Sequence, residues 1–194
     1  MSRGLGDVYK RQHLLRSDCG VSAMEFALIL PILVLFSAGT IEYSRMIILT
    51  QKLQSGAFVL ADLTARDKTL STDQLEDIFL AIDQVIRPFE FDASGHAIVT
   101  SLGADEDDDP IVNWTCGGAG DFEAESHLVE AGEVIELPGD ITLVHGETVI
   151  AAEVFYDFEP LFGVGLAPRT IHRFAFYKPR LGDLTELDDD CPEA

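Results

Sequence analysis

The sequence predicts an α+β protein: a long apolar N-terminal helix, a second helix, and then an antiparallel β-sheet. Three observations lead to this fold class. An uncharged run over 26–41 opens a helical pattern, and no proline interrupts 32–87. A second amphipathic segment begins near Ser71. Beyond Pro88, short apolar runs alternate with turn residues, as in strands of an antiparallel sheet.

Charge divides the chain into two unlike parts. The 194 residues include 34 acidic and 13 basic ones, for a net charge of −21. Such a surface repels phosphates, so we expect no nucleic-acid partner. Residues 1–20 are nevertheless net positive, because they contain four basic and two acidic side chains. A basic start, an apolar run and an acidic body predict a single-pass membrane protein whose N-terminus is cytoplasmic.

The apolar run is slightly short for a spanning helix, which needs about 17–25 residues. Extending it back to Val21 gives a transmembrane segment over 21–41 but includes Glu25. A carboxylate there costs roughly a few kcal/mol even on mild insertion scales. Glu25 must therefore lie at the interface, be neutralised, or meet a cationic partner.

The residues around Glu25 resemble a type IV prepilin cleavage site. Gly20 is followed by four small or apolar residues and then by Glu25-Phe26. The longer stretch GVSAMEFALILPILVLFSAGTIEYSRMI resembles the TadE/TadG-like pseudopilins, or minor pilins, of the tight-adherence (Tad/Flp) pilus system. The shared features also include Pro31 within the apolar helix and the exit motif 42–45, EYSR. The resemblance extends to about Ile47.

This resemblance implies a leader over 1–20 that a prepilin peptidase removes between Gly20 and Val21. The first dozen residues also resemble translated sequencing-adapter text, so the natural start can differ. The new α-amino group of Val21 would meet Glu25 on the same helix or on a neighbour. Glu25 and Phe26 would then serve assembly, and Pro31 would kink the helix.

The resemblance also implies partners and a location. Other pilins and pseudopilins of the Tad machinery and inner-membrane lipid would surround the helix. Residues 42–194 would form a helix extension and an acidic, pilin-like head in the periplasm, with the pilus or cell surface as a further destination. The implied role is assembly or initiation of the pilus as a minor subunit.

Two other functions remain open. An uncleaved single-pass anchor carrying a periplasmic binding domain would use Glu25 only to mark the membrane edge. A secreted protein with a cleaved signal peptide would begin near Thr40, after the small residues of 37–39.

Local patterns predict the remaining elements. The first helix should extend to about Arg66. Ser71 and Gln74 form a capping box for a second helix that ends at Arg87-Pro88. Its apolar face comprises Leu75, Ile78, Phe79, Ile82, Val85 and Ile86. The predicted strands are Ala97–Leu102, Ile111–Thr115, Ile141–Val144, Thr148–Phe158 and Thr170–Tyr177, with a hairpin turn at His145-Gly146-Glu147.

Motifs for catalysis do not occur. The sequence has no HExxH, GxSxG, CxxC or phosphate-binding glycine loop, so we expect neither an enzyme nor a cofactor. The acidic run 105–109 offers Asp105, Asp107 and Asp109 as weak calcium ligands, but such runs are more often solvated loops. Between Arg87 and Arg169 there are 18 acidic residues and no Lys or Arg. Exposure, counter-ions or a basic partner subunit would relieve their repulsion.

The cysteines give one further prediction. Cys116 and Cys191 would both lie outside the cytoplasm, where a disulfide between them is possible and two free thiols are the alternative.

Overall fold

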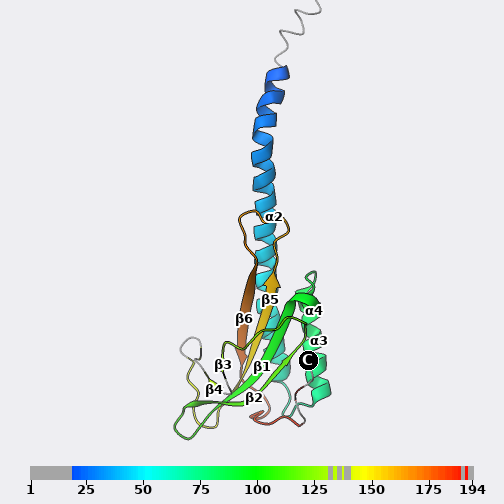
Figure 1. Cartoon of the computed structure of the whole chain (residues 1–194). Helices are drawn as coiled ribbons and strands as arrows, with labels where there is room; N and C mark the ends of the chain where they lie inside the picture. The colour runs from blue at the N-terminus through cyan, green and yellow to red at the C-terminus, as the bar shows by residue number, and fades with distance from the viewer. Residues whose placement is uncertain (1–18, 131–132, 135–136, 138–140, 189–190, 192–194) are drawn as a thin grey trace, which may run out of the picture.

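The protein consists of a helical stem and an α+β head (Figure 1). The structure is a computed structural model that describes residues 19–130, 133–134, 137, 141–188 and 191. Most of the predicted leader, 1–18, lies outside the described residues. Helix α2 (Cys19–Thr64) has 46 residues and is about 69 Å long at 1.5 Å per residue. The predicted long N-terminal helix is confirmed, and it continues on both sides of Pro31.

Helix α2 has two different halves. Its first part, from Val21 to Ser37, exposes every side chain. From Glu42 onward, one face is buried at helical spacing against the head, and this face includes Leu49, Leu53, Ala57, Leu60 and Ala61. We call residues 21–41 the upper stem and residues 42–64 the lower stem.

Helix α3 (Thr72–Ile86) lies beside the lower stem. The capping box is present: the backbone N–H of Gln74 donates to the Ser71 hydroxyl, and the Gln74 side chain accepts from the Ser71 N–H. The buried face contains Leu75, Phe79, Ile82 and Ile86. Where the helices meet, the Ile86 side chain lies beside Gly56 of α2.

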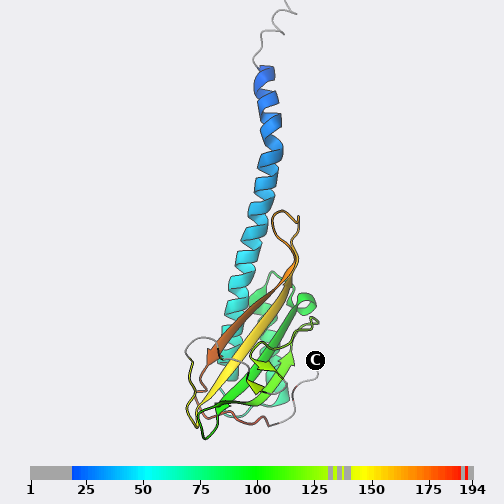
Figure 2. The same cartoon turned by 60° about the vertical axis from the view of Figure 1, so that its left-hand side comes forward.

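One antiparallel sheet forms the body of the head (Figure 2). After the short helix α4 (Phe91–Ser94), its strands are β1 (Gly95–Ala104), β2 (Pro110–Gly118), β5 (Thr148–Phe158) and β6 (Arg169–Tyr177). They lie in the order β2-β1-β5-β6, and all three neighbouring pairs are antiparallel.

Different parts of the chain pack against the two faces of the sheet. On one face, alternate residues of β5, including Ile150, Val154 and Phe158, pack against α2 and α3. On the other face, Ala151 packs with Leu102, Leu128 and Leu143 in a smaller apolar cluster. The segment covering this second face contains two short strands that the sequence did not predict, β3 (Val129–Glu130) and β4 (Glu133–Val134).

One predicted strand is wrong. Residues 141–144 follow β4 without strand structure, although Leu143 is buried and the turn at 145–146 is present. The prediction had paired Ile141–Val144 with the following strand as a hairpin. In the structure β1 pairs with one edge of β5 and β6 pairs with the other. Residues 141–144 therefore cannot pair with β5.

Candidate functional site: the stem and its junction with the head

The upper stem carries the residues predicted to act in processing and assembly. The Gly20–Val21 bond lies in the first turn of α2. Val21, Glu25 and Phe26 are all exposed. Val21 and Glu25 are four residues apart in one continuous helix, so they share a face of the stem.

The described part of the chain contains one helix that is long and apolar enough to cross a membrane, Val21–Thr64. Its most apolar window is wholly exposed in the structure. An exposed apolar surface of this extent is unfavourable in water, so it requires lipid or other chains around it.

Glu42 marks the junction between stem and head. Its side chain is completely buried, although it is the first residue after the apolar run. Its Oε1 accepts hydrogen bonds from the backbone N–H groups of Phe162 and, at 2.9 Å, Gly163. Its Oε2 accepts from the N–H of Val164 at 2.9 Å. These three donors compensate the desolvation of the carboxylate and fix the loop over 159–168, which we call the β5–β6 loop.

Neighbouring residues of the EYSR motif complete this junction. The Tyr43 hydroxyl donates to the Gly165 carbonyl at 3.3 Å. The Arg45 guanidinium lies 5.8 Å from the centre of the Phe89 ring in the head. Gly163 and Gly165 have φ angles of +65° and +78°, which L side chains rarely adopt. The motif and the glycines together hold the β5–β6 loop against α2.

The acidic run 105–109 forms the turn between β1 and β2. The Asp105 carboxylate accepts from the N–H groups of Asp107 and Asp109, both at 2.9 Å. The Asp108 carboxylate accepts from the N–H of His145 at 2.7 Å. Across the described residues, no three His, Cys, Asp or Glu side chains converge to hold a metal ion. The calcium candidates are therefore not brought together, and two of the five carboxylates bond the backbone instead.

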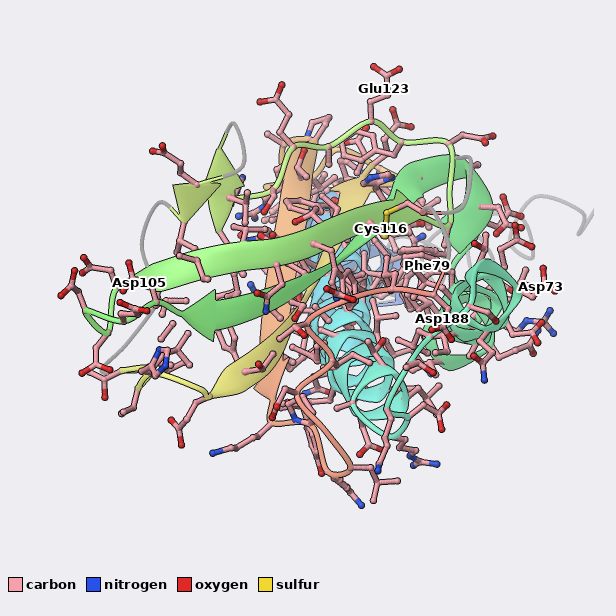
Figure 3. All side chains as sticks on the ribbon, turned by 90° about the horizontal axis from the view of Figure 1, so that it is seen from below. Asp73, Phe79, Asp105, Cys116, Glu123 and Asp188 are labelled. Atoms are coloured by element: carbon pink, nitrogen blue, oxygen red, sulfur yellow. A yellow bond between two sulfur atoms is a disulfide. The ribbon has the colours of Figure 1, made fainter. Side chains whose placement is uncertain are left out.

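The acidic side chains are spread around the head. Seen from below, Asp73, Asp105 and Glu123 project at well-separated places on its outline (Figure 3). This distribution favours exposure to solvent as the main relief of their repulsion.

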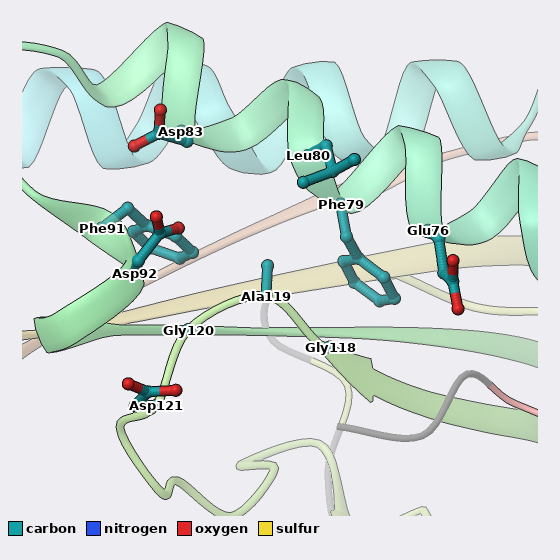
Figure 4. A pocket seen from close by; sticks show the side chains of 10 residues that line it. All are labelled: Glu76, Phe79, Leu80, Asp83, Phe91, Asp92, Gly118, Ala119, Gly120 and Asp121. Atoms are coloured by element: carbon teal, nitrogen blue, oxygen red, sulfur yellow. The ribbon is translucent and has the colours of Figure 1, made fainter.

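A hollow between α3 and the end of β2 combines acidic and apolar residues (Figure 4). Its volume is about 460 Å³. Phe79, Leu80 and Phe91 supply apolar surface, and four carboxylates surround it, those of Glu76, Asp83, Asp92 and Asp121. This composition suits a cationic group with an apolar portion.

Glu153 is a second buried carboxylate, on the sheet face opposite the helices. It accepts from the Ser126 hydroxyl and, at 2.9 Å, from the His127 N–H, and its Oε1 lies 3.0 Å from His172 Nε2. Burial raises the pKa of Glu153, but the close contact with His172 and the hydrogen bonds from Ser126 and His127 outweigh it and leave the pKa below the ordinary 4.5. Glu153 thus fastens the covering segment to the sheet.

Cys116 of β2 and Cys191 are joined by a disulfide, across 75 residues of sequence. The Cys116 end is buried, and Figure 3 places it on the sheet. The bond attaches the C-terminal segment to an edge strand.

Sequence reasoning missed the structural roles of Glu42 and Glu153. Glu42 was recognised only as part of a motif, and its partners lie about 120 residues away in sequence. Glu153 left a weak signal, since a charged residue between apolar neighbours in a strand requires a partner when it is buried. Neither partner could be identified before the strands were placed.

Comparison with protein families gives a match to the stem. A family model described as TadE-like protein matches residues 20–62, which is the stem from the predicted cleavage site almost to its end. No curated protein matches the chain. No solved structure matches it either.

The match and the apolar helix fit a membrane-anchored protein associated with a Tad pilus. The TadE-like family is structural and non-enzymatic. The resemblance inferred from the sequence is thereby confirmed over residues 20–62, which match the TadE-like family model.

Proposed function

We propose that this chain is a minor pilin or pseudopilin that takes part in assembling or initiating a tight-adherence pilus. One observation carries the proposal: the TadE-like segment lies on an exposed apolar helix that continues into a folded head. An exposed helix of this kind needs neighbours, and other pilin stems in the membrane would provide them.

Glu25 would act in assembly after the leader is removed. Cleavage between Gly20 and Val21 creates an α-amino group one helical turn from the Glu25 carboxylate, on its own chain or a neighbouring one. In hydrocarbon this pairing offsets the cost of an ionised carboxylate. When the pair forms between two chains, it would align their stems with each other.

The proposed location is the inner membrane, with a cytoplasmic N-terminus and a periplasmic head. The Cys116–Cys191 disulfide supports the location of the head, since disulfides persist in oxidising compartments. The proposed partners are a prepilin peptidase, other pilins and pseudopilins, and membrane lipid.

Intact mass and N-terminal sequencing of the membrane-extracted protein test the processing step. With its prepilin peptidase present, the mature chain should begin at Val21, and without the peptidase the leader should remain. An uncut chain in the presence of active peptidase would remove the pseudopilin mechanism. A start near Thr40 would instead assign the protein to the secreted class.

Two variants separate processing from assembly. Gly20→Val should block cleavage, whereas Glu25→Gln should be cleaved but should crosslink poorly to other pilin stems in the membrane. Glu106→Gln, an exposed acid of the turn between β1 and β2, is the matched control and should affect neither step. Normal crosslinking of Glu25→Gln would contradict the assembly role.

The hollow beside α3 favours a second candidate function, that of an anchored binding protein. Its carboxylates and apolar surface would take a basic segment of a partner. Titration of the detergent-solubilised chain with a short Lys- and Leu-containing peptide tests this candidate. Asp83→Asn should weaken binding, and Asp107→Asn, outside the hollow, should not.

A further inference from the structure

The β5–β6 loop ends the head on the side that faces the upper stem. In both views it rises above the rest of the head alongside α2 (Figures 1 and 2). Val164 lies 3.8 Å from the position that a Cβ on Gly39 would occupy. The loop therefore reaches the level of the last turn of the apolar run 26–41.

This loop exposes two large apolar side chains. Leu161 is 62% exposed and Phe162 is 57% exposed, although the backbone beside them is tightly held. The three N–H groups bound by Glu42 include that of Phe162 itself. The exposure is thus a property of a fixed loop, because the junction positions these side chains rather than leaving them to collapse onto the head.

An apolar groove joins the loop to the stem. It has a volume of about 460 Å³, and its lining includes Leu35, Phe36 and Ile47 of α2 and Val164 of the loop. Leu35 and Phe36 belong to the segment expected in the membrane. The groove therefore connects the loop, two residues beyond Phe162, with the surface that lipid would cover.

We propose that Leu161 and Phe162 insert into the outer interface of the same bilayer that the upper stem spans, so that the head docks on a lipid surface. Apolar and aromatic side chains at this depth bury area among the headgroups and upper acyl chains. The groove beside them would be filled by lipid. Two contacts, the stem and the loop, would then fix the tilt of the head relative to the membrane, where a stem alone would not.

The inference depends on anchoring of the stem but not on a role in a pilus. Reconstitution of the full chain at one copy per lipid nanodisc tests it, with Cys19→Ser removing the cysteine outside the disulfide. An environment-sensitive fluorophore is attached at Leu161→Cys. Leu181→Cys, in a head residue of 57% exposure, is the matched control, and Leu35→Cys reports on anchoring.

Lipids carrying spin labels near the headgroup should quench the fluorophore at 161 several-fold more than at 181, and its emission should shift to the blue. Phe162→Cys should behave like Leu161→Cys, which guards against a local effect of one label. Hydrogen exchange at 162–164 checks that the labelled loop is still held by Glu42.

The possible outcomes distinguish a failure of lipid docking from a failure of membrane anchoring. Quenching at 35 without quenching at 161 or 162 would overturn lipid docking and leave the anchor intact. No quenching at 35 would overturn the anchor, and the docking proposal with it. A blue shift that needs two copies per disc and occurs without lipid quenching would identify a neighbouring chain as the occupant and overturn the proposal.

Discussion

The upper and lower stem are parts of one helix, yet they are stabilised in different ways. The lower stem buries Leu49, Leu53 and Leu60 completely against α3 and the sheet. The upper stem exposes residues of the same type, among them Leu28, Leu33 and Leu35. Composition alone therefore does not decide where a helix is buried; the partner does. The head supplies that partner for one half, and membrane or other stems must supply it for the other.

A matched pair of leucines should show the largest effect of this difference. Leu53→Ala removes a completely buried side chain and should lower the free energy of unfolding by about 2–5 kcal/mol, the usual range for such cavities. Leu35→Ala, in the exposed half, should leave it nearly unchanged in detergent. Urea unfolding followed by Trp114 fluorescence measures both. Equal losses would mean that the upper stem also packs on the head.

Removing the Cys116–Cys191 disulfide tests how stable the head is when its C-terminal segment is not attached to β2. Replacing Cys116 and Cys191 together by Ser should lower the free energy of unfolding by about 2–4 kcal/mol, because the unfolded chain loses a constraint across 75 residues. The stem should stay helical by circular dichroism. An unchanged unfolding midpoint would show that the tether contributes nothing to the head.

Glu42 lies at the boundary between the two halves of the stem. A variant at this position tests whether its carboxylate holds the β5–β6 loop against α2. Glu42→Gln replaces one acceptor oxygen by an amide that faces backbone N–H groups, at a cost of about 1–3 kcal/mol. Hydrogen exchange at 162–164 should accelerate. Glu25→Gln, in the upper stem, should leave these amides protected, and equal acceleration in both variants would disprove the local role of Glu42.

Glu153 should give the smallest effect, confined to acidic pH. Because its pKa is lower in the folded than in the unfolded chain, its stabilising contribution is complete above 4.5 and is lost as the pH falls through the folded value. Glu153→Gln should therefore differ most from the wild type at about pH 6 and least at about pH 3. Urea unfolding at both pH values measures the difference, and one that does not shrink on acidification would contradict this linkage.

Much of the fold follows from local signals. The cap at Ser71 determines where α3 begins, and the apolar run in 148–158 identifies β5, which is buried on both faces. These features depend on residues close together in sequence, so they can be predicted without a tertiary model. The TadE-like start is likewise local, since Gly20, Glu25 and Pro31 lie within twelve residues.

What could not be predicted depends on distant partners. Residues 141–144 look like a strand, but the edge they would need is taken by β6, whose residues come later in the chain. The burial of Glu42 requires the β5–β6 loop to return to the helix, and nothing near Glu42 indicates that loop. The predicted cleavage site and assembly contacts depend on other molecules and remain predictions.

The unbroken course of α2 from Cys19 to Thr64 also sets a direction. Each residue of an α-helix turns the chain by about 100°. The number of residues between Glu25 and Glu42 therefore fixes the rotation of the head, about the axis of α2, relative to the face of the stem that carries Glu25. Adding one residue between them would swing the head by about 100° around the stem axis, whereas seven would nearly restore it. The length of this helix thus also determines the orientation of the head about the stem axis. That orientation decides which side of the head each neighbouring chain around the stem would contact.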